Sequence, residues 1–226
     1  MDSEIARMSH VLRGSLQTSL LNVQSLAVTV ARDAEAQESI RIIREELLRA
    51  GRMLLGAFEV CSLELGDVTR TNLKTLVTRA LDQDGVDGVV LSEGPWPDVV
   101  GDVRLLGLAI LHLARNARAA TPPGKRPPEI HASSTRNGGV VVLVRDWGRG
   151  FGTVEPPGRA FTSSRPEHVA TGLLMVERIA RLHRGGLSFE TSSRGTVVSL
   201  SLPGPARART VRTRSARVIK ERARPR

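Results

Sequence analysis

The chain has 226 residues, of which 40% are hydrophobic and 3% aromatic, and its net charge is +10. This composition fits a folded protein of one large or two small domains with an aliphatic core, and it excludes a disordered chain. The longest apolar run, 105–111, is far shorter than the ~20 residues that cross a bilayer. The single cysteine, Cys61, excludes an internal disulfide, suits a reducing compartment and is expected to be a small buried hydrophobe. The sequence therefore predicts a cytoplasmic protein without a transmembrane segment.

Residues 5–31 carry apolar side chains at steps of three and four, which is the pattern of an amphipathic helix. The polar stretch 32–39 interrupts this pattern, and a second apolar stripe follows it. The two stripes are Leu12, Leu16, Leu20, Val23, Ala27 and Val30, then Ile40, Ile43, Leu47, Ala50, Leu54 and Cys61. This pattern predicts an antiparallel helical hairpin. Because one hairpin rarely buries its stripes alone, we expect a homodimer in which two hairpins form a four-helix bundle.

The rest of the chain alternates between helix and strand patterns, with Asn137-Gly138-Gly139 as a hairpin turn. The expected elements are a helix over 71–83, a strand over 88–94, a helix over 102–121, a hairpin over 129–148, a Gly- and Pro-rich loop over 148–170, a helix over 172–184, and strands over 186–193 and 195–203. The fold class is therefore α + α/β, a helical hairpin followed by an α+β sandwich. The expected domains are 1–66 and 67–203, with a tail over 204–226.

Most of the positive charge lies at the end of the chain. Nine Lys or Arg and one Glu fall between Pro203 and Arg226, which is +8 of the net +10. Such a run is typical of a solvated, disordered tail. The alternative is contact with nucleic acid, anionic lipid or an acidic partner, although no aromatic residue interleaves the arginines to stack on bases.

Three clusters in the second domain have the chemistry of one nucleotide site. His112 and Asn116 are four residues apart and share a helix face. The Asn116 side-chain oxygen suits Mg²⁺, which takes its remaining ligands from phosphates and water. Asp146 follows a strand, where its carboxylate can accept a hydrogen bond from an amino group such as that of adenine. Gly148 and Gly150 allow the backbone to approach a ligand closely.

The third cluster combines a polar loop with a helix start. Gly172 lies at the expected amino terminus of a helix, where free N–H groups favour phosphate. Arg165, in the loop before it, can add charge-assisted hydrogen bonds to the same phosphates.

Taken together, these clusters resemble the N, G1, F and G2 boxes of the histidine-kinase ATPase domain, whose Bergerat-type (GHKL) fold is shared with Hsp90, gyrase and MutL. The matching residues are Asn116 with Ala117, Asp146-x-Gly148-x-Gly150-Phe151, Phe161 with its loop, and Gly172. The first hairpin resembles the dimerisation and phosphoacceptor domain of the same kinases, and its His10, Leu12, Arg13 and Leu16 are similar to the phosphoacceptor box. The resemblance covers roughly residues 5–203.

The resemblance implies an ATP-dependent protein histidine kinase of a two-component system. His10, which points away from the stripe of its helix, would accept the γ-phosphoryl group of ATP beside Arg13 and pass it to an aspartate of a response-regulator receiver domain. Asn116 would hold Mg²⁺ and Asp146 would bind adenine. The implied nucleotide-binding set is His112, Asn116, Asp146, Gly148, Gly150, Phe151, Arg165, Thr171, Gly172 and Leu173.

Several positions depart from the family's pattern. Val11 stands where active members carry an acidic base, and Gly14 stands where they carry Thr or Asn. His112 replaces the first Asn of the N box, and Ala170 replaces the first Gly of the G2 box. These departures leave open a pseudokinase or a dimeric phosphotransfer adaptor that binds a receiver domain. An anti-sigma-type serine kinase, another ATPase of this fold and a nucleotide-free interaction module are further alternatives.

Overall fold

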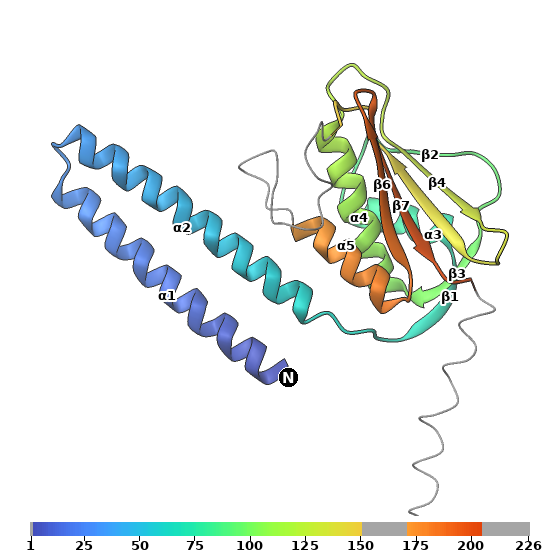
Figure 1. Cartoon of the computed structure of the whole chain (residues 1–226), viewed down its shortest axis with the longest axis horizontal. Coiled ribbons are helices and arrows are strands. Elements are labelled where there is room, and N and C mark those ends of the chain that lie inside the picture. Colours follow the sequence, from blue (N-terminus) through green and yellow to red (C-terminus); the bar gives the residue numbers. More distant parts are fainter. Residues whose placement is uncertain (1, 151–170, 205–226) are drawn as a thin grey trace, which may run out of the picture. The chain divides into compact units, whose positions relative to one another are not determined.

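The computed structural model describes residues 2–150 and 171–204 (Figure 1). The expected basic tail and most of the expected Gly- and Pro-rich loop lie outside these ranges. Contacts divide the chain into two compact units, one of Met1–Glu64 with Glu155–Met175 and one of Leu65–Val154 with Val176–Arg226, and each is described by itself. Within the described ranges, no helix is both long enough and apolar enough to cross a bilayer.

The first unit is an antiparallel helical hairpin, as the sequence predicts (Figure 1). Helix α1 spans Asp2–Thr29 and helix α2 spans Ala34–Cys61. The predicted stripe along α1 is confirmed, because each of its members is half-buried: Leu12, Leu16, Leu20, Val23, Ala27 and Val30. His10 is exposed, as expected from its place off the stripe.

The turn between the two helices is shorter than the predicted stretch 32–39. Asp33 caps α2, since its Oδ1 accepts the backbone N–H groups of Glu35 and Ala36 at 3.1 and 3.0 Å. The polar residues after Asp33 therefore form the first turns of α2 rather than a loop.

The predicted stripe of α2 is only partly right. Ile40 is buried and Leu47 is half-buried. Gly51 faces α1, because a Cβ built on it would lie 3.4 Å from Cδ1 of Leu16. Four predicted members are exposed in the single hairpin: Ile43, Ala50, Leu54 and Cys61. Within one hairpin, α1 covers a single row of side chains on α2. Cys61 lies outside that row and is exposed, so the expectation that it is buried is wrong for a single chain.

The remaining described residues form a five-stranded sheet, a two-stranded sheet and three helices. The elements are β1 Val68–Asn72, α3 Leu73–Gln83, β2 Val90–Leu91, β3 Asp98–Asp102, α4 Val103–Ala120, β4 Glu129–Ser134, β5 Val140–Arg145, α5 Thr171–Leu182, β6 Gly186–Ser192 and β7 Gly195–Leu202. The predicted α+β sandwich is confirmed.

The five-stranded sheet has the order β2-β4-β5-β7-β6. Its strand pairs are antiparallel, except that β2 pairs with β4 in parallel. Helices α4 and α5 lie on one face of this sheet (Figure 1). The core forms between them, from residues that are almost fully buried: Leu105, Ile110, Leu113, Ile130, Val142, Val144, Ile179 and Leu200.

The structure corrects the predicted strands in two places. Strands β1 and β3 pair with each other and were not predicted, because both are five residues long and mix charged with apolar side chains. The predicted strand over 88–94 is reduced to the two residues of β2. The predicted turn before β5 is confirmed, and Gly138 takes a φ of 73°, which favours glycine.

Asp102 joins three parts of the second unit. It is the N-cap of α4, since its Oδ1 accepts the N–H groups of Arg104 and Leu105 at 3.0 and 3.1 Å. Its Oδ2 accepts the N–H of Gly66 at 2.9 Å, and its own backbone N–H donates to Nε2 of His183 at 2.9 Å. One buried residue thus holds the segment before β1 and the start of α4 with its side chain, and His183, directly after α5, with its backbone N–H.

The hydrogen bonds to Asp102 favour its charged form. Burial alone would raise the pKa of this carboxyl, but the N–H groups of Gly66, Leu105 and Arg104 and the Arg104 guanidinium lower the pKa below its ordinary value. A lowered native pKa adds stability above the unfolded-state pKa. That stability is lost as the pH falls through the native pKa.

We expect Asp102→Ala to lower the free energy of unfolding at pH 7 by about 1–2 kcal/mol, because it removes a helix cap and a buried acceptor. The difference from wild type should shrink as the pH falls below about 4, where the unfolded-state aspartate is protonated. Urea unfolding at pH 7 and at pH 3, followed by circular dichroism, measures both effects.

The control for this prediction is Asp102→Asn. Asparagine caps a helix as well as aspartate does, but its amide nitrogen would face the N–H of Gly66. An intermediate loss of stability is expected. Equal stability of Asp102→Ala and wild type would show that the hydrogen bonds of this carboxylate do not stabilise the fold.

Candidate functional site

Asp146 is the best-defined residue of the candidate site. It directly follows β5 and is only 8% exposed. Its Oδ1 accepts the N–H of Gly148 at 2.9 Å and the N–H of Thr196 at 3.1 Å. Its backbone N–H donates to the carbonyl of Thr196 at 2.9 Å. The protein therefore uses Oδ1 fully, whereas no described residue donates a hydrogen bond to Oδ2.

A carboxylate with one oxygen bonded to the protein and the other without a donor among the described residues has the chemistry to accept a hydrogen bond from an amino group. A carboxylate is an acceptor with two oxygens, and here one oxygen fixes the side chain while the other stays available. Because the side chain is held by two backbone N–H groups, it does not have to be ordered when a ligand binds. That Asp146 accepts a hydrogen bond from a ligand amine stays a prediction.

The predicted approach of a ligand to Gly148 and Gly150 stays a prediction, because the close neighbours of both glycines are protein carbonyl groups. A Cβ on Gly148 would lie 2.6 Å from the carbonyl oxygen of Ala120, the last residue of α4. Gly150 has a φ of 68°, and a Cβ on it would lie 2.3 Å from the carbonyl oxygen of Ser192. What approaches these glycines is protein backbone. They close the loop against α4 and β6.

Sequence reasoning missed the residues of β7 that hold Asp146. Thr196 is 3% exposed and makes two hydrogen bonds with Asp146: its N–H donates to Oδ1, and its carbonyl accepts the backbone N–H of Asp146. Gly195 has a φ of 120°, and a Cβ there would lie 2.1 Å from the carbonyl oxygen of Asp146. The Gly-Thr pair at the start of a strand was a usable signal, but its partner is 50 residues away in the sequence.

Helix α4 carries the second predicted cluster. Asp102 caps this helix, and its apolar face is buried along Leu106, Ile110 and Leu113. Asn116 is exposed and His112 is half-buried, and both lie beside the buried face rather than in it. Within the described ranges, no three His, Cys, Asp or Glu gather to hold a metal ion.

The remaining predicted nucleotide residues are described only in part. Thr171, Gly172 and Leu173 form the first turn of α5 and are half-buried. Phe151 and Arg165 lie outside the described residues. The structure therefore brings together Asp146, Gly148, Gly150 and the end of α4.

The predicted phosphoacceptor lies in the first unit. His10 and Arg13 are both exposed and are three residues apart on α1, so they share a face. Val11 is 67% exposed, and Gly14 has open space where a Cβ would be. The imidazole is accessible, and its immediate neighbour in the sequence is an apolar side chain.

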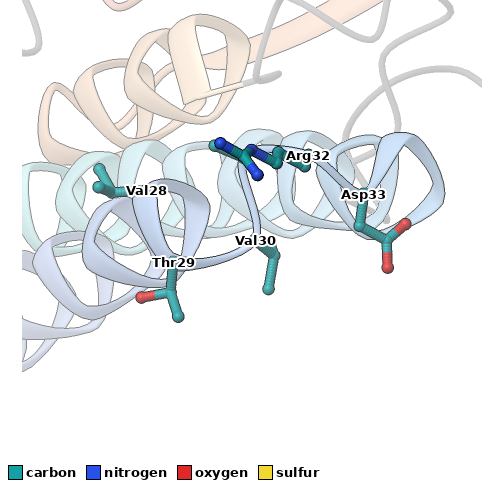
Figure 2. Close-up of a pocket in the computed structure, with 6 residues that line it drawn as sticks. Val28, Thr29, Val30, Arg32 and Asp33 are labelled. Atoms are coloured by element: carbon teal, nitrogen blue, oxygen red, sulfur yellow. The ribbon is translucent and has the colours of Figure 1, made fainter.

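A shallow pocket of about 420 Å³ lies at the turn of the hairpin, far along the sequence from His10 (Figure 2). It is lined by Val28, Thr29, Val30, Ala31, Arg32 and Asp33. The carboxylate of Asp33 is already used to cap α2. The pocket therefore offers little chemistry for a nucleotide, and none of the predicted site residues line it.

Comparison with known proteins agrees with this fold. Residues 101–206 match the family described as histidine kinase-, DNA gyrase B- and HSP90-like ATPase. Sporulation kinase B of Bacillus subtilis is 25% identical over 210 residues, which is 88% of this chain and 47% of that protein. The C4-dicarboxylate transport sensor protein DctS of Rhodobacter capsulatus is 26% identical over 152 residues, which is 65% of this chain and 23% of that protein. The chain thus spans half or less of the length of these relatives.

Solved structures show the same fold. The mycobacterial sensor histidine kinase MprB is 25% identical, with a TM-score of 0.51, and the match covers 61% of this chain and 98% of that one. The Acinetobacter baumannii histidine kinase AdeS is 18% identical, with a TM-score of 0.56 and coverage of 87% and 98%. Full-length ShkA, solved in complex with AMPPNP, is 20% identical, with a TM-score of 0.59 and coverage of 90% and 46%.

Residues 101–206 thus carry the GHKL-type ATPase domain of this family. With the helical hairpin before it, the chain resembles the core of a two-component sensor histidine kinase.

We expect Gly148→Ala to lower the free energy of unfolding by about 1–3 kcal/mol, because its methyl group would be forced against the Ala120 carbonyl. Gly107→Ala is the matched control. It lies inside α4, and its Cβ would be 3.7 Å from Cβ of Ala80, so higher helix propensity should make it neutral or stabilising. Urea unfolding compares the two, and equal stability would contradict the close approach at Gly148.

Proposed function

We propose that this chain is an ATP-dependent protein histidine kinase core that phosphorylates its own His10 in the cytoplasm. The observation that carries the proposal is the buried Asp146 carboxylate, with one oxygen fixed by backbone N–H groups and the other available to an adenine amine. The ATPase-family match over residues 101–206 supports it, and so does the solved complex of ShkA with AMPPNP.

The residues present fit MgATP. Asp146 would accept from the adenine amino group, and Asn116 would supply a hard oxygen to Mg²⁺ beside the phosphates. The first turn of α5, with Thr171, Gly172 and Leu173, would offer backbone N–H groups to the phosphates. His112 lies one turn before Asn116 on the same face of α4 and would contact the phosphates or the metal ion. Bound Mg²⁺ supplies neutralisation of the phosphate charge.

Phosphoryl transfer would make His10 a phosphohistidine. An imidazole nitrogen of His10 attacks the γ-phosphorus, an N–P bond forms, and the bond between the γ-phosphorus and its bridging oxygen breaks to leave ADP. The imidazole N–H proton is released to solvent. Arg13, on the same face of α1, would stabilise charge on the transferring group. The phosphoryl group then passes to an aspartate of a response-regulator receiver domain.

A homodimer would cover the apolar side chains that the single hairpin leaves outside. These include Leu26 on α1, which lies on another face than His10, and Ile42, Ile43, Leu48 and Leu54 on α2, each at least 38% exposed. Two hairpins packed as a four-helix bundle would bury them. The proposed assembly is thus a dimer of hairpins that presents His10 on its outer surface.

A second candidate function is a pseudokinase or phosphotransfer adaptor that binds a receiver domain. The observation that favours it is Val11, an exposed apolar residue where a base would assist His10. General-base assistance is worth about 10²–10⁴ in rate, so its absence would leave a slow or silent kinase with an intact nucleotide site.

We expect Asp146→Asn to bind MgATP roughly 10- to 100-fold more weakly than wild type, because an amide nitrogen would replace the free acceptor Oδ2. Thermal stability should stay close to that of wild type, since Oδ1 still accepts from Gly148 and Thr196. Titration calorimetry and a circular dichroism melt measure the two properties. Unchanged affinity would remove Asp146 from adenine recognition.

With γ-labelled ATP and Mg²⁺, we expect wild type to acquire a label that is labile in acid and stable in alkali. The label should be lost in His10→Ala and in Asn116→Ala. His131→Ala is the matched control, because His131 is also exposed but lies on β4 with its Nδ1 hydrogen-bonded to Ser92.

A label that persists in His10→Ala would overturn His10 as the acceptor. MgATP binding without any label would support the adaptor, most clearly if Val11→Glu then restored labelling. The absence of both MgATP binding and labelling in wild type would overturn both candidate functions.

A further inference from the structure

The end of α4 is hydrogen-bonded to the loop that carries Asp146. The hydroxyl of Thr121 accepts the backbone N–H of Trp147 at 3.2 Å and donates to the carbonyl of Ala117 at 2.9 Å. Ala117 directly follows Asn116, and Trp147 directly follows Asp146. A single hydroxyl group therefore links the two residues that neighbour the proposed metal ligand and the proposed adenine acceptor.

Trp147 also fixes the far end of the connection between α4 and β4. Its indole Nε1–H donates to the carbonyl of Pro127 at 2.9 Å. The guanidinium groups of Arg145 and Arg126 lie over its ring, 4.1 and 5.6 Å from the centroid. Thr121 begins this connection and Pro127 lies near its end, so Trp147 holds it at both ends.

The geometry leaves little room for the loop to shift. The Gly148 Cα lies against the Ala120 carbonyl so closely that a Cβ would be 2.6 Å away. Asp146 is fixed on its other side by Thr196. The end of α4 and the Asp146 loop thus approach each other with hydrogen bonds on both sides of the contact.

We propose that Thr121 and Trp147 are positioning residues that set the spacing between Asn116 and Asp146, so that both ends of one nucleotide are bound at the same time. This inference rests on the proposed function. ATP is a ligand with its adenine at one end and its metal-bound phosphates at the other. When the spacing is loosened, a ligand that uses both contacts loses affinity, while a ligand that uses the Asp146 contact alone does not.

The test compares MgATP with adenosine, which lacks the phosphates. In Thr121→Val, which removes the hydroxyl, MgATP should bind roughly tenfold more weakly, and adenosine should bind within about twofold of wild type. Thr121→Ser keeps the hydroxyl and should restore the MgATP affinity. Titration calorimetry on the full chain measures both ligands.

Trp147→Phe keeps the backbone N–H and an aromatic ring but removes the bond to Pro127. It should weaken MgATP selectively and by less than Thr121→Val does. The matched control is Trp96→Phe, which removes the indole N–H that donates to Ser92. This control should bind both ligands as wild type does, and it leaves Trp147 as the single tryptophan, whose fluorescence should change on addition of MgATP.

The outcomes separate the two proposals. An equal loss of MgATP and adenosine affinity in Thr121→Val would show a merely structural role and would overturn the positioning assignment, as would no loss at all. Failure of wild type to bind either ligand would overturn the proposed function itself, and the positioning assignment with it.

Discussion

The candidate site depends on one carboxylate oxygen, Oδ1 of Asp146, which accepts two backbone N–H groups from separate segments. Through Gly148 it bends the chain after β5, and through Thr196 it joins that bend to the start of β7. Removing this acceptor would leave two buried donors unpaired, at about 1–3 kcal/mol each. The same side chain thus organises the local fold and presents its second oxygen to a ligand.

Asp102 uses the same principle at the other end of α4. Each aspartate ends or directly follows a strand, and each uses Oδ1 to accept two backbone N–H groups. In Asp102 the second oxygen is used by Gly66, whereas in Asp146 no described residue uses it. This difference in the second oxygen distinguishes a residue that holds the fold together from one that is available for binding.

The sequence predicted what depends on neighbours along the chain. The stripe of α1, the turn at Gly138 and the loop after Asp146 all follow from spacing within a few residues. Thr196, Thr121 and the β1–β3 pair could not be predicted, because their partners are 26 or more residues away. The predicted stripe of α2 was partly wrong because α2 carries apolar side chains on two adjacent faces, and their spacing does not say which face packs against α1.

The hydrogen bond between Gly66 and Asp102 has a mechanical consequence. Ser62 still bonds to the last turn of α2 through its N–H, and Gly66 is already fixed to the second unit. Few residues remain between these two anchors, and each contributes two soft backbone dihedrals. The segment between the last turn of α2 and Gly66 is therefore short, with residues 63–65 alone between the two hydrogen bonds.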